Sequence, residues 1–71
     1  MMTLYHGSNT GEYEYLKRLL TARIIQILVE ENGMSMTDAF DKVYSSDIFK
    51  KLSDPATGLY LQSPRYIMSY L

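Results

Sequence analysis

His6 and Ser8 form the only pairing of a base with a nucleophile in the sequence, because His6 is the sole histidine and cysteine is absent. In serine hydrolases a histidine takes the proton of the serine hydroxyl, and a third, acidic group orients the histidine. Residues 1–11 contain no acidic residue that could act as this third group. We therefore expect no catalysis from this pair.

Paired acidic residues are a second potential source of chemistry. Acid–base catalysis needs two carboxyl groups of different pKa in an occluded pocket, but all the pairs here fall on predicted helix surfaces, where charge mainly solvates the protein. The absence of cysteine and the single histidine exclude the usual zinc sites. The sequence thus predicts no enzyme, no metal site and no cofactor. The acidic pairs are Glu12/Glu14, Glu30/Glu31 and Asp38/Asp41.

Tyrosine is the residue type that is over-represented. The chain has seven tyrosines and no tryptophan, and three of the tyrosines lie in the last twelve residues beside an arginine. Tyrosine and arginine are enriched at the energetic centres of protein interfaces. They also cover small cores with their hydroxyls at the water edge, and both roles remain open at this point. The candidate partner-binding residues are Tyr60, Gln62, Arg65, Tyr66 and Tyr70.

The charge balance argues against nucleic acid as a partner. Seven Lys and Arg against eight Asp and Glu give a formal net charge of −1 over 71 residues, without the basic cluster that phosphate binding requires. Residues 22–52 do have the order of a helix–turn–helix motif. Their second helix carries Asp38 and Asp41 against Lys42, so its exposed face would repel phosphate. A small DNA-binding regulator is therefore the weakest alternative.

No segment resembles a targeting or membrane element. The longest apolar stretch, Ile24–Val29, is interrupted by Gln26 and is too short to span a bilayer. Met1–Thr10 lack the basic and apolar regions of a secretory signal. The sequence predicts no membrane partner and a cytoplasmic location.

A long helix over residues 12–32 is the element expected to organise the fold, after an irregular lead over residues 1–11. Gly33 is well placed to end it. Helical spacing gives this helix two apolar stripes, and a helix with two apolar sides needs covering on both. The main stripe is Leu16, Leu20, Ile24, Ile27 and Leu28, and the second is Ala22, Ile25 and Val29, a candidate seam for self-association.

Residues 33–71 carry signals for three shorter helices. Ser35 can cap the first of these helices, and Ser45 or Ser46 can end it and cap the next. Ser63 followed by proline begins the last one. Residues 54–58 form a turn, and residues 59–62, rich in β-formers, are expected to be a short extended segment. The predicted fold is mainly α: one domain over residues 12–71, a small bundle of about four helices with one short extended segment before the last helix.

The ending resembles a known family. Residues 57–67, Thr-Gly-Leu-Tyr-Leu-Gln-Ser-Pro-Arg-Tyr-Ile, are similar to the closing motif of very short bacterial proteins of unknown function. Gly33-Met34-Ser35, followed by Ala39 and Phe40, also resembles this family, and the similarity covers residues 14–71. The resemblance implies no enzymatic activity. It also implies a place beside ADP-ribosyltransferase-like proteins, in arrangements suggestive of toxin–antitoxin modules.

Residues 4–8, Leu-Tyr-His-Gly-Ser, are similar instead to the opening strand of those ADP-ribosyltransferase-like proteins. Carried over strictly, only His6 would inherit a contact with NAD. The rest of that fold cannot fit into the remaining residues, so no NAD binding is expected.

Taken together, these patterns predict a non-catalytic protein-interaction module. Its expected partner is another protein, and the resemblance implies an ADP-ribosyltransferase-like toxin that the module accompanies or neutralises. A structural homo-oligomer, joined through the second stripe of the long helix, is the alternative.

Overall fold

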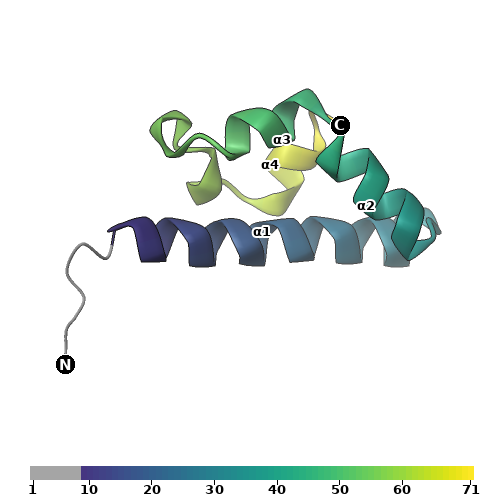
Figure 1. The fold of residues 1–71 in the computed structure, drawn as a ribbon. Coiled ribbons are helices and arrows are strands. Elements are labelled where there is room, and N and C mark those ends of the chain that lie inside the picture. The colour runs from purple at the N-terminus through teal and green to yellow at the C-terminus, as the bar shows by residue number, and fades with distance from the viewer. Residues whose placement is uncertain (1–8) are drawn as a thin grey trace.

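The 24-residue helix α1 (Asn9–Asn32) forms one layer of the molecule by itself, and the computed structural model places all later elements on one side of it (Figure 1). The structure describes residues 9–71. Within them, Asn9–Gly11 are helical, so the helix begins three residues before the predicted start at Glu12. The remaining part of the predicted irregular lead, with His6 and Ser8, lies outside the described residues.

Gly33 ends α1 as predicted. Its φ of 69° lies in the left-handed region, which glycine adopts without the steric cost that a Cβ brings. The Met34 amide then donates to the Leu28 carbonyl at 3.2 Å, satisfying one of the last helical acceptors. The chain therefore turns back over α1 at this point.

Each later α-helix begins at a serine predicted to cap it, and of the two alternatives for the third helix Ser46 is the cap whereas Ser45 ends the helix before it. The hydroxyl of Ser35 accepts from the Asp38 amide at 3.1 Å, and Ser46 and Ser63 accept in the same way, each at 3.2 Å. Such a bond satisfies one of the free amides of the first turn. The three helices are α2 (Met36–Tyr44), α3 (Asp47–Leu52) and α4 (Pro64–Met68).

The prediction of an extended segment over residues 59–62 is wrong. Two 3-10 helices, η2 (Pro55–Thr57) and η3 (Leu59–Leu61), meet at Gly58, whose φ is 70°. The Leu61 and Gln62 amides donate to the carbonyls of Gly58 and Leu59, at 3.1 and 3.0 Å. Because residues 9–71 contain no strand to pair with, local turns are how this segment satisfies its backbone.

The hydrophobic core lies between α1 and the elements above it. α1 supplies one side of the core, and the last helix contributes a single, fully buried isoleucine. Four α-helices and no strand in residues 9–71 confirm the predicted mainly α bundle. None of the described helices is both long and apolar enough to cross a membrane. The core residues are Leu20, Ile24, Ile25, Leu28, Ala39, Val43, Ile48, Leu52 and Ile67.

Candidate interaction surfaces

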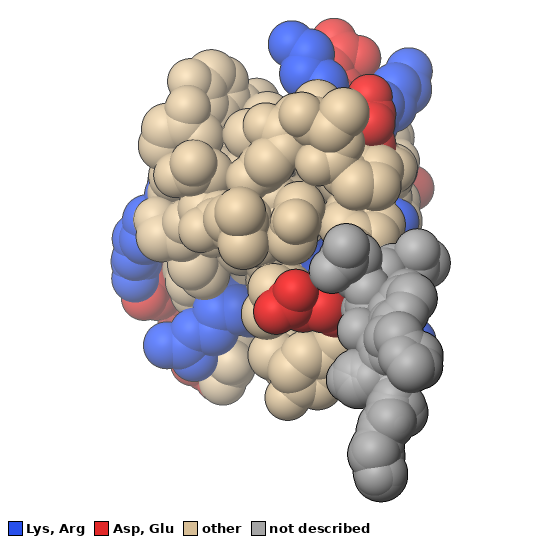
Figure 2. Space-filling model, turned by 90° about the vertical axis from the view of Figure 1, so that its left-hand side faces the viewer, with Lys and Arg blue, Asp and Glu red and all other residues tan. Residues whose placement is uncertain are grey.

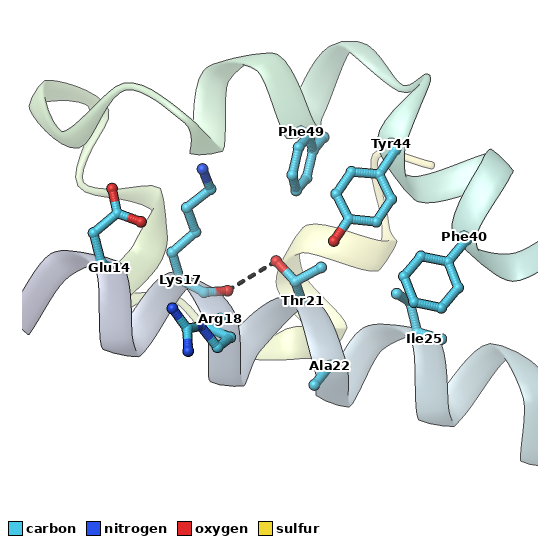
Figure 3. A pocket seen from close by; sticks show the side chains of 9 residues that line it. All are labelled: Glu14, Lys17, Arg18, Thr21, Ala22, Ile25, Phe40, Tyr44 and Phe49. Atoms are coloured by element: carbon cyan, nitrogen blue, oxygen red, sulfur yellow. Dashed lines mark hydrogen bonds between the residues drawn. The ribbon is translucent and has the colours of Figure 1, made fainter.

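A groove runs between α1 and the pair α2–α3, shown in Figure 3 and called here the α1–α2 groove. Its volume is about 370 Å³, and a second hollow of about 370 Å³ continues it toward Val29 and Met36. The two hollows share three apolar residues, so they form one channel along α1. The first hollow is lined by Glu14, Lys17, Arg18, Thr21, Ala22, Ile25, Phe40, Tyr44 and Phe49.

Aromatic rings form the upper wall of the α1–α2 groove. The rings of Phe40 and Tyr44 are nearly parallel, with centres 5.5 Å apart, and Tyr44 meets Phe49 at 4.6 Å. The Lys17 ammonium lies 5.4 Å from the Phe49 ring centre, within cation–π range. The Thr21 hydroxyl donates to the Lys17 carbonyl at 2.8 Å, so it is satisfied within the helix (Figure 3). The groove can hold an apolar side chain but has no acid–base pair poised for chemistry.

A second groove lies on the other flank of α1, against η3, and is called the α1–η3 groove. Its volume is about 490 Å³. Leu19 on one wall and Leu61 on the other are 50% and 67% exposed. Figure 2 shows the end of the molecule that carries η2 and η3: uncharged residues cover most of its upper part, an acidic residue lies near the centre of the view, and other charged residues lie at the margins. The groove is lined by Leu16, Leu19, Leu20, Arg23, Tyr60, Leu61, Gln62 and Pro64.

Only two of the five candidate partner-binding residues, Tyr60 and Gln62, line this groove. Gln62 is exposed, whereas Tyr60 is half-buried and meets the Tyr13 ring edge-on at 5.0 Å. Tyr60 therefore packs on the core and also faces the groove. This position is compatible with both interpretations of the tyrosines, as interface residues and as a cover of the core.

Arg65 is engaged within the chain. Its guanidinium donates two hydrogen bonds to the Glu31 carboxylate, at 3.0 and 2.5 Å, and ties α4 to the end of α1. The hydrogen bonds from Arg65 hold the pKa of Glu31 below its ordinary value, and the same contact raises the pKa of Arg65. Arg65 does not line the α1–η3 groove.

Tyr66 and Tyr70 form a pair of their own on α4 and the turn after it. Their ring centres are 5.4 Å apart, and the Tyr70 hydroxyl donates to the Tyr66 hydroxyl at 3.4 Å. Both rings are exposed, at 42% and 58%, and neither lines the groove.

The three residues of the candidate seam differ in exposure. Ala22 is exposed and Val29 is half-buried, but Ile25 is only 5% exposed and belongs to the core. The reason is that α2 crosses this flank of α1 and covers Ile25. All three residues nevertheless line the second hollow of the α1–α2 groove, so the seam for self-association stays a prediction.

Tyr13 is an important residue that the sequence analysis missed. It is 6% exposed, and its hydroxyl donates to the Leu52 carbonyl at 3.0 Å. Burial, followed by the nearby Glu14 and Asp54 charges, raises its pKa. The signal was present, because Tyr13 lies three and seven residues before Leu16 and Leu20 and so extends the main apolar stripe.

The potential chemical groups are not assembled into a site in the described part of the chain. Within residues 9–71, no three His, Cys, Asp or Glu side chains lie close enough to hold a metal ion. The acidic pairs singled out from the sequence are all exposed. His6 and Ser8, and the NAD contact that the resemblance implied for His6, lie outside the described residues.

The chain matches no protein-family model, no curated protein and no solved structure.

Proposed function

We propose that this protein is a non-catalytic interaction module that binds another protein through the α1–η3 groove. One observation carries the proposal: an apolar hollow of about 490 Å³ is flanked by two leucines that are at least half exposed. Protein interfaces combine such an apolar centre with a polar rim, and Gln62 and Arg23 supply polar groups at this one.

The class of partner comes from the resemblance of the chain ending to short bacterial proteins. On that basis the partner is an ADP-ribosyltransferase-like protein of the bacterial cytoplasm, which this module accompanies or neutralises. The groove favours a partner that presents a few large apolar side chains, because its walls carry little charge apart from Arg23.

The test compares two exposed positions of similar size on different flanks of α1. Leu61→Asp places a charge in the α1–η3 groove, whereas Met36→Asp places one at the edge of the α1–α2 groove, at a helix start that tolerates acids. Met36 is 56% exposed, so both changes leave the core intact. Tagged forms of the two variants and the unaltered chain are used to capture proteins from the source cytoplasm, with mass spectrometry as the readout.

We expect one protein to be retained by the unaltered chain and by Met36→Asp, and to be lost with Leu61→Asp. An ADP-ribosyltransferase-like protein in that position supports the whole proposal. Equal capture by all three forms would show that the α1–η3 groove is not the binding surface, and no captured protein other than the bait would contradict a partner-binding function.

A further inference from the structure

The α1–α2 groove exposes large apolar side chains that the proposed function leaves unused. Met36, Phe40 and Tyr44 follow one another at four-residue intervals on α2, and they are 56%, 43% and 49% exposed. Figure 3 shows Phe40, Tyr44 and Phe49 in a row above α1, where they form the upper wall of the groove. Side chains four residues apart share one helix face, so this wall is a continuous apolar surface. Such exposed surface often marks an interface.

The two ends of the groove carry opposite charge. The hollow in Figure 3 is lined by Lys17 and Arg18 together with Glu14, so one positive charge is in excess there. The second hollow, at the other end, is lined by Glu30, with no basic residue among its described walls. The groove therefore has a basic end, an acidic end and an apolar middle. The residues of the middle, shared by both hollows, are Ala22, Ile25 and Phe40.

A second copy of the chain can cover this groove with complementary charge. A two-fold axis that lies in the interface and runs across the groove reverses its ends and keeps each wall on its own side. The basic end of one copy then faces the acidic end of the other, twice. The upper wall of one copy meets the upper wall of the other, so apolar side chains contact apolar side chains.

Arg18 and Glu30 are the groups that such a dimer brings together. With the axis midway between Ala22 and Ile25, Arg18 of one copy lies at the level of Val29 of the other. These two residues are eleven positions apart, about three helical turns, so they lie on the same side of α1. The carbon stem of an arginine covers apolar surface while its guanidinium reaches a polar group beyond it. Arg18 can therefore pack on Val29 and pair with the adjacent Glu30.

Both charged groups are available for this contact. Arg18 and Glu30 are exposed, and neither takes part in the ion pairs formed within residues 9–71. The Gln26 side chain, which lines the second hollow, donates to Glu30 Oε2 at 3.1 Å. This bond holds the carboxylate at the margin of the groove.

We propose that two copies of this chain associate through the α1–α2 groove, with the α1 helices antiparallel, the upper walls in contact and Arg18 of each copy paired with Glu30 of the other. The occupant of the groove is thus a second copy. Ala22 and Val29 of the seam expected from the sequence lie in this interface. The proposal goes beyond the partner-binding function, because the α1–η3 groove lies on the other flank of α1 and stays open.

A charge exchange tests the pairing. Arg18→Glu sets glutamate against glutamate at both contacts, and Glu30→Arg sets arginine against arginine, so each variant alone should dimerise about tenfold more weakly than the unaltered chain. An equimolar mixture of the two variants restores both opposite-charge contacts. The readout is molar mass by sedimentation equilibrium at low salt over a concentration series, where a monomer is 8.2 kDa.

Two further variants test the apolar surface and control for charge in general. Phe40→Asp puts a carboxylate into the apolar middle of the interface and should weaken the dimer about tenfold as well. Lys42→Glu reverses an exposed charge on α2 that lines neither hollow, so it should leave the mass unchanged. Circular dichroism verifies that every form keeps its helices.

The expected pattern is a dimer for the unaltered chain, for Lys42→Glu and for the mixture, and mainly monomer for each charge variant alone and for Phe40→Asp. Three results would overturn the proposal: an unaltered chain that is monomeric throughout the series, weakened variants that dimerise as well as it does, or a mixture that stays monomeric. Leu61→Asp should dimerise normally. Failure of the dimer and failure of the partner-binding function therefore give different results.

Discussion

Tyr13 contacts both layers of the protein. Its ring meets Tyr60 above α1, and its hydroxyl donates to the Leu52 carbonyl at the end of α3. Removing only the hydroxyl would leave that buried carbonyl without its side-chain donor while keeping the ring packing. An unsatisfied buried acceptor costs more than the bond itself contributes.

Tyr13→Phe should therefore lower the free energy of unfolding by about 1 to 2 kcal/mol, measured by urea denaturation. Tyr15→Phe is the matched control, because Tyr15 is exposed and makes no side-chain hydrogen bond within residues 9–71. Equal stability of the two variants would show that the Tyr13–Leu52 bond adds nothing to the fold.

Because Glu31 and Arg65 are paired in the folded chain, we expect the stability of the protein to depend on pH. The pKa of Glu31 is lowered in the folded chain from a reference value of 4.5. A lowered pKa means that the folded state favours the charged form, so the stabilisation is present above about pH 4.5 and is lost as the pH falls through the lowered value.

Glu31→Gln should accordingly be less stable than the unaltered chain at pH 7, and the difference should shrink toward zero as the pH falls below about 4.5. Urea midpoints over this range measure it, with Asp41→Asn as the control carboxylate. Both groups are exposed, so the effect is small and weakens with salt. A difference that persists unchanged at low pH would contradict the ionic origin.

Among the elements, α3 has only six residues, and its capping serine also contacts the preceding helix. The Ser46 hydroxyl accepts from the Phe49 amide and also donates to the Val43 carbonyl at 2.6 Å. It therefore joins the end of α2 to the start of α3. No other side chain makes this connection among the described hydrogen bonds.

Ser46→Ala should cost about 1 to 2 kcal/mol of stability, measured by thermal or urea denaturation. Ser53→Ala is a suitable comparison, since the exposed Ser53 hydroxyl only donates back to the Phe49 carbonyl at 3.1 Å. We expect a much smaller loss there. Similar losses at the two serines would mean that the cap does not hold α3.

The element boundaries were largely predictable because their causes are local. Ser35, Ser46 and Ser63 start helices through their own hydroxyls, and Gly33 ends one through its own backbone. Residues 59–62 were not predictable in this way. A residue's β-propensity reflects how well it packs on a neighbouring strand. Tyr60 instead packs on Tyr13, which lies 47 residues earlier in the chain, so the local sequence does not contain the contact that decides its structure.

The candidate surfaces were predictable only in part, for the same reason. Tyr60 and Gln62 share a groove, but Arg65 is drawn to Glu31, 34 positions earlier in the chain. The two apolar sides of the long helix indicated that both need cover. They did not reveal that α2 covers the side of α1 that carries Ile25 and leaves the side that carries Leu19 exposed.

At the scale of the whole molecule, one long helix is covered by short ones. The described structure measures 42 × 22 × 18 Å, and a chain of this size buries too little surface for a large reserve of stability. The single buried residue of α4, Ile67, is 2% exposed. Its side chain therefore supports a large share of the fold.

Ile67→Ala should lower the free energy of unfolding by about 2 to 4 kcal/mol, enough to populate the unfolded state of so small a domain. Circular dichroism with urea should show α1 losing its helicity together with the rest. Tyr70→Ala, at an exposed position, is the control and should change little. A helical signal from α1 that outlasts the other helices would contradict this cooperativity.

The position of the core on α1 also sets an order of events during synthesis. A ribosome completes the apolar face of Ile24 and Leu28 first and makes the covering Ile67 about 40 residues later. At a synthesis rate of roughly 5 to 20 residues per second, Ile67 is added roughly 2 to 8 seconds after that face. During this interval the cover of the apolar helix is incomplete, so the time of greatest exposure to misassociation falls before Ile67 is added.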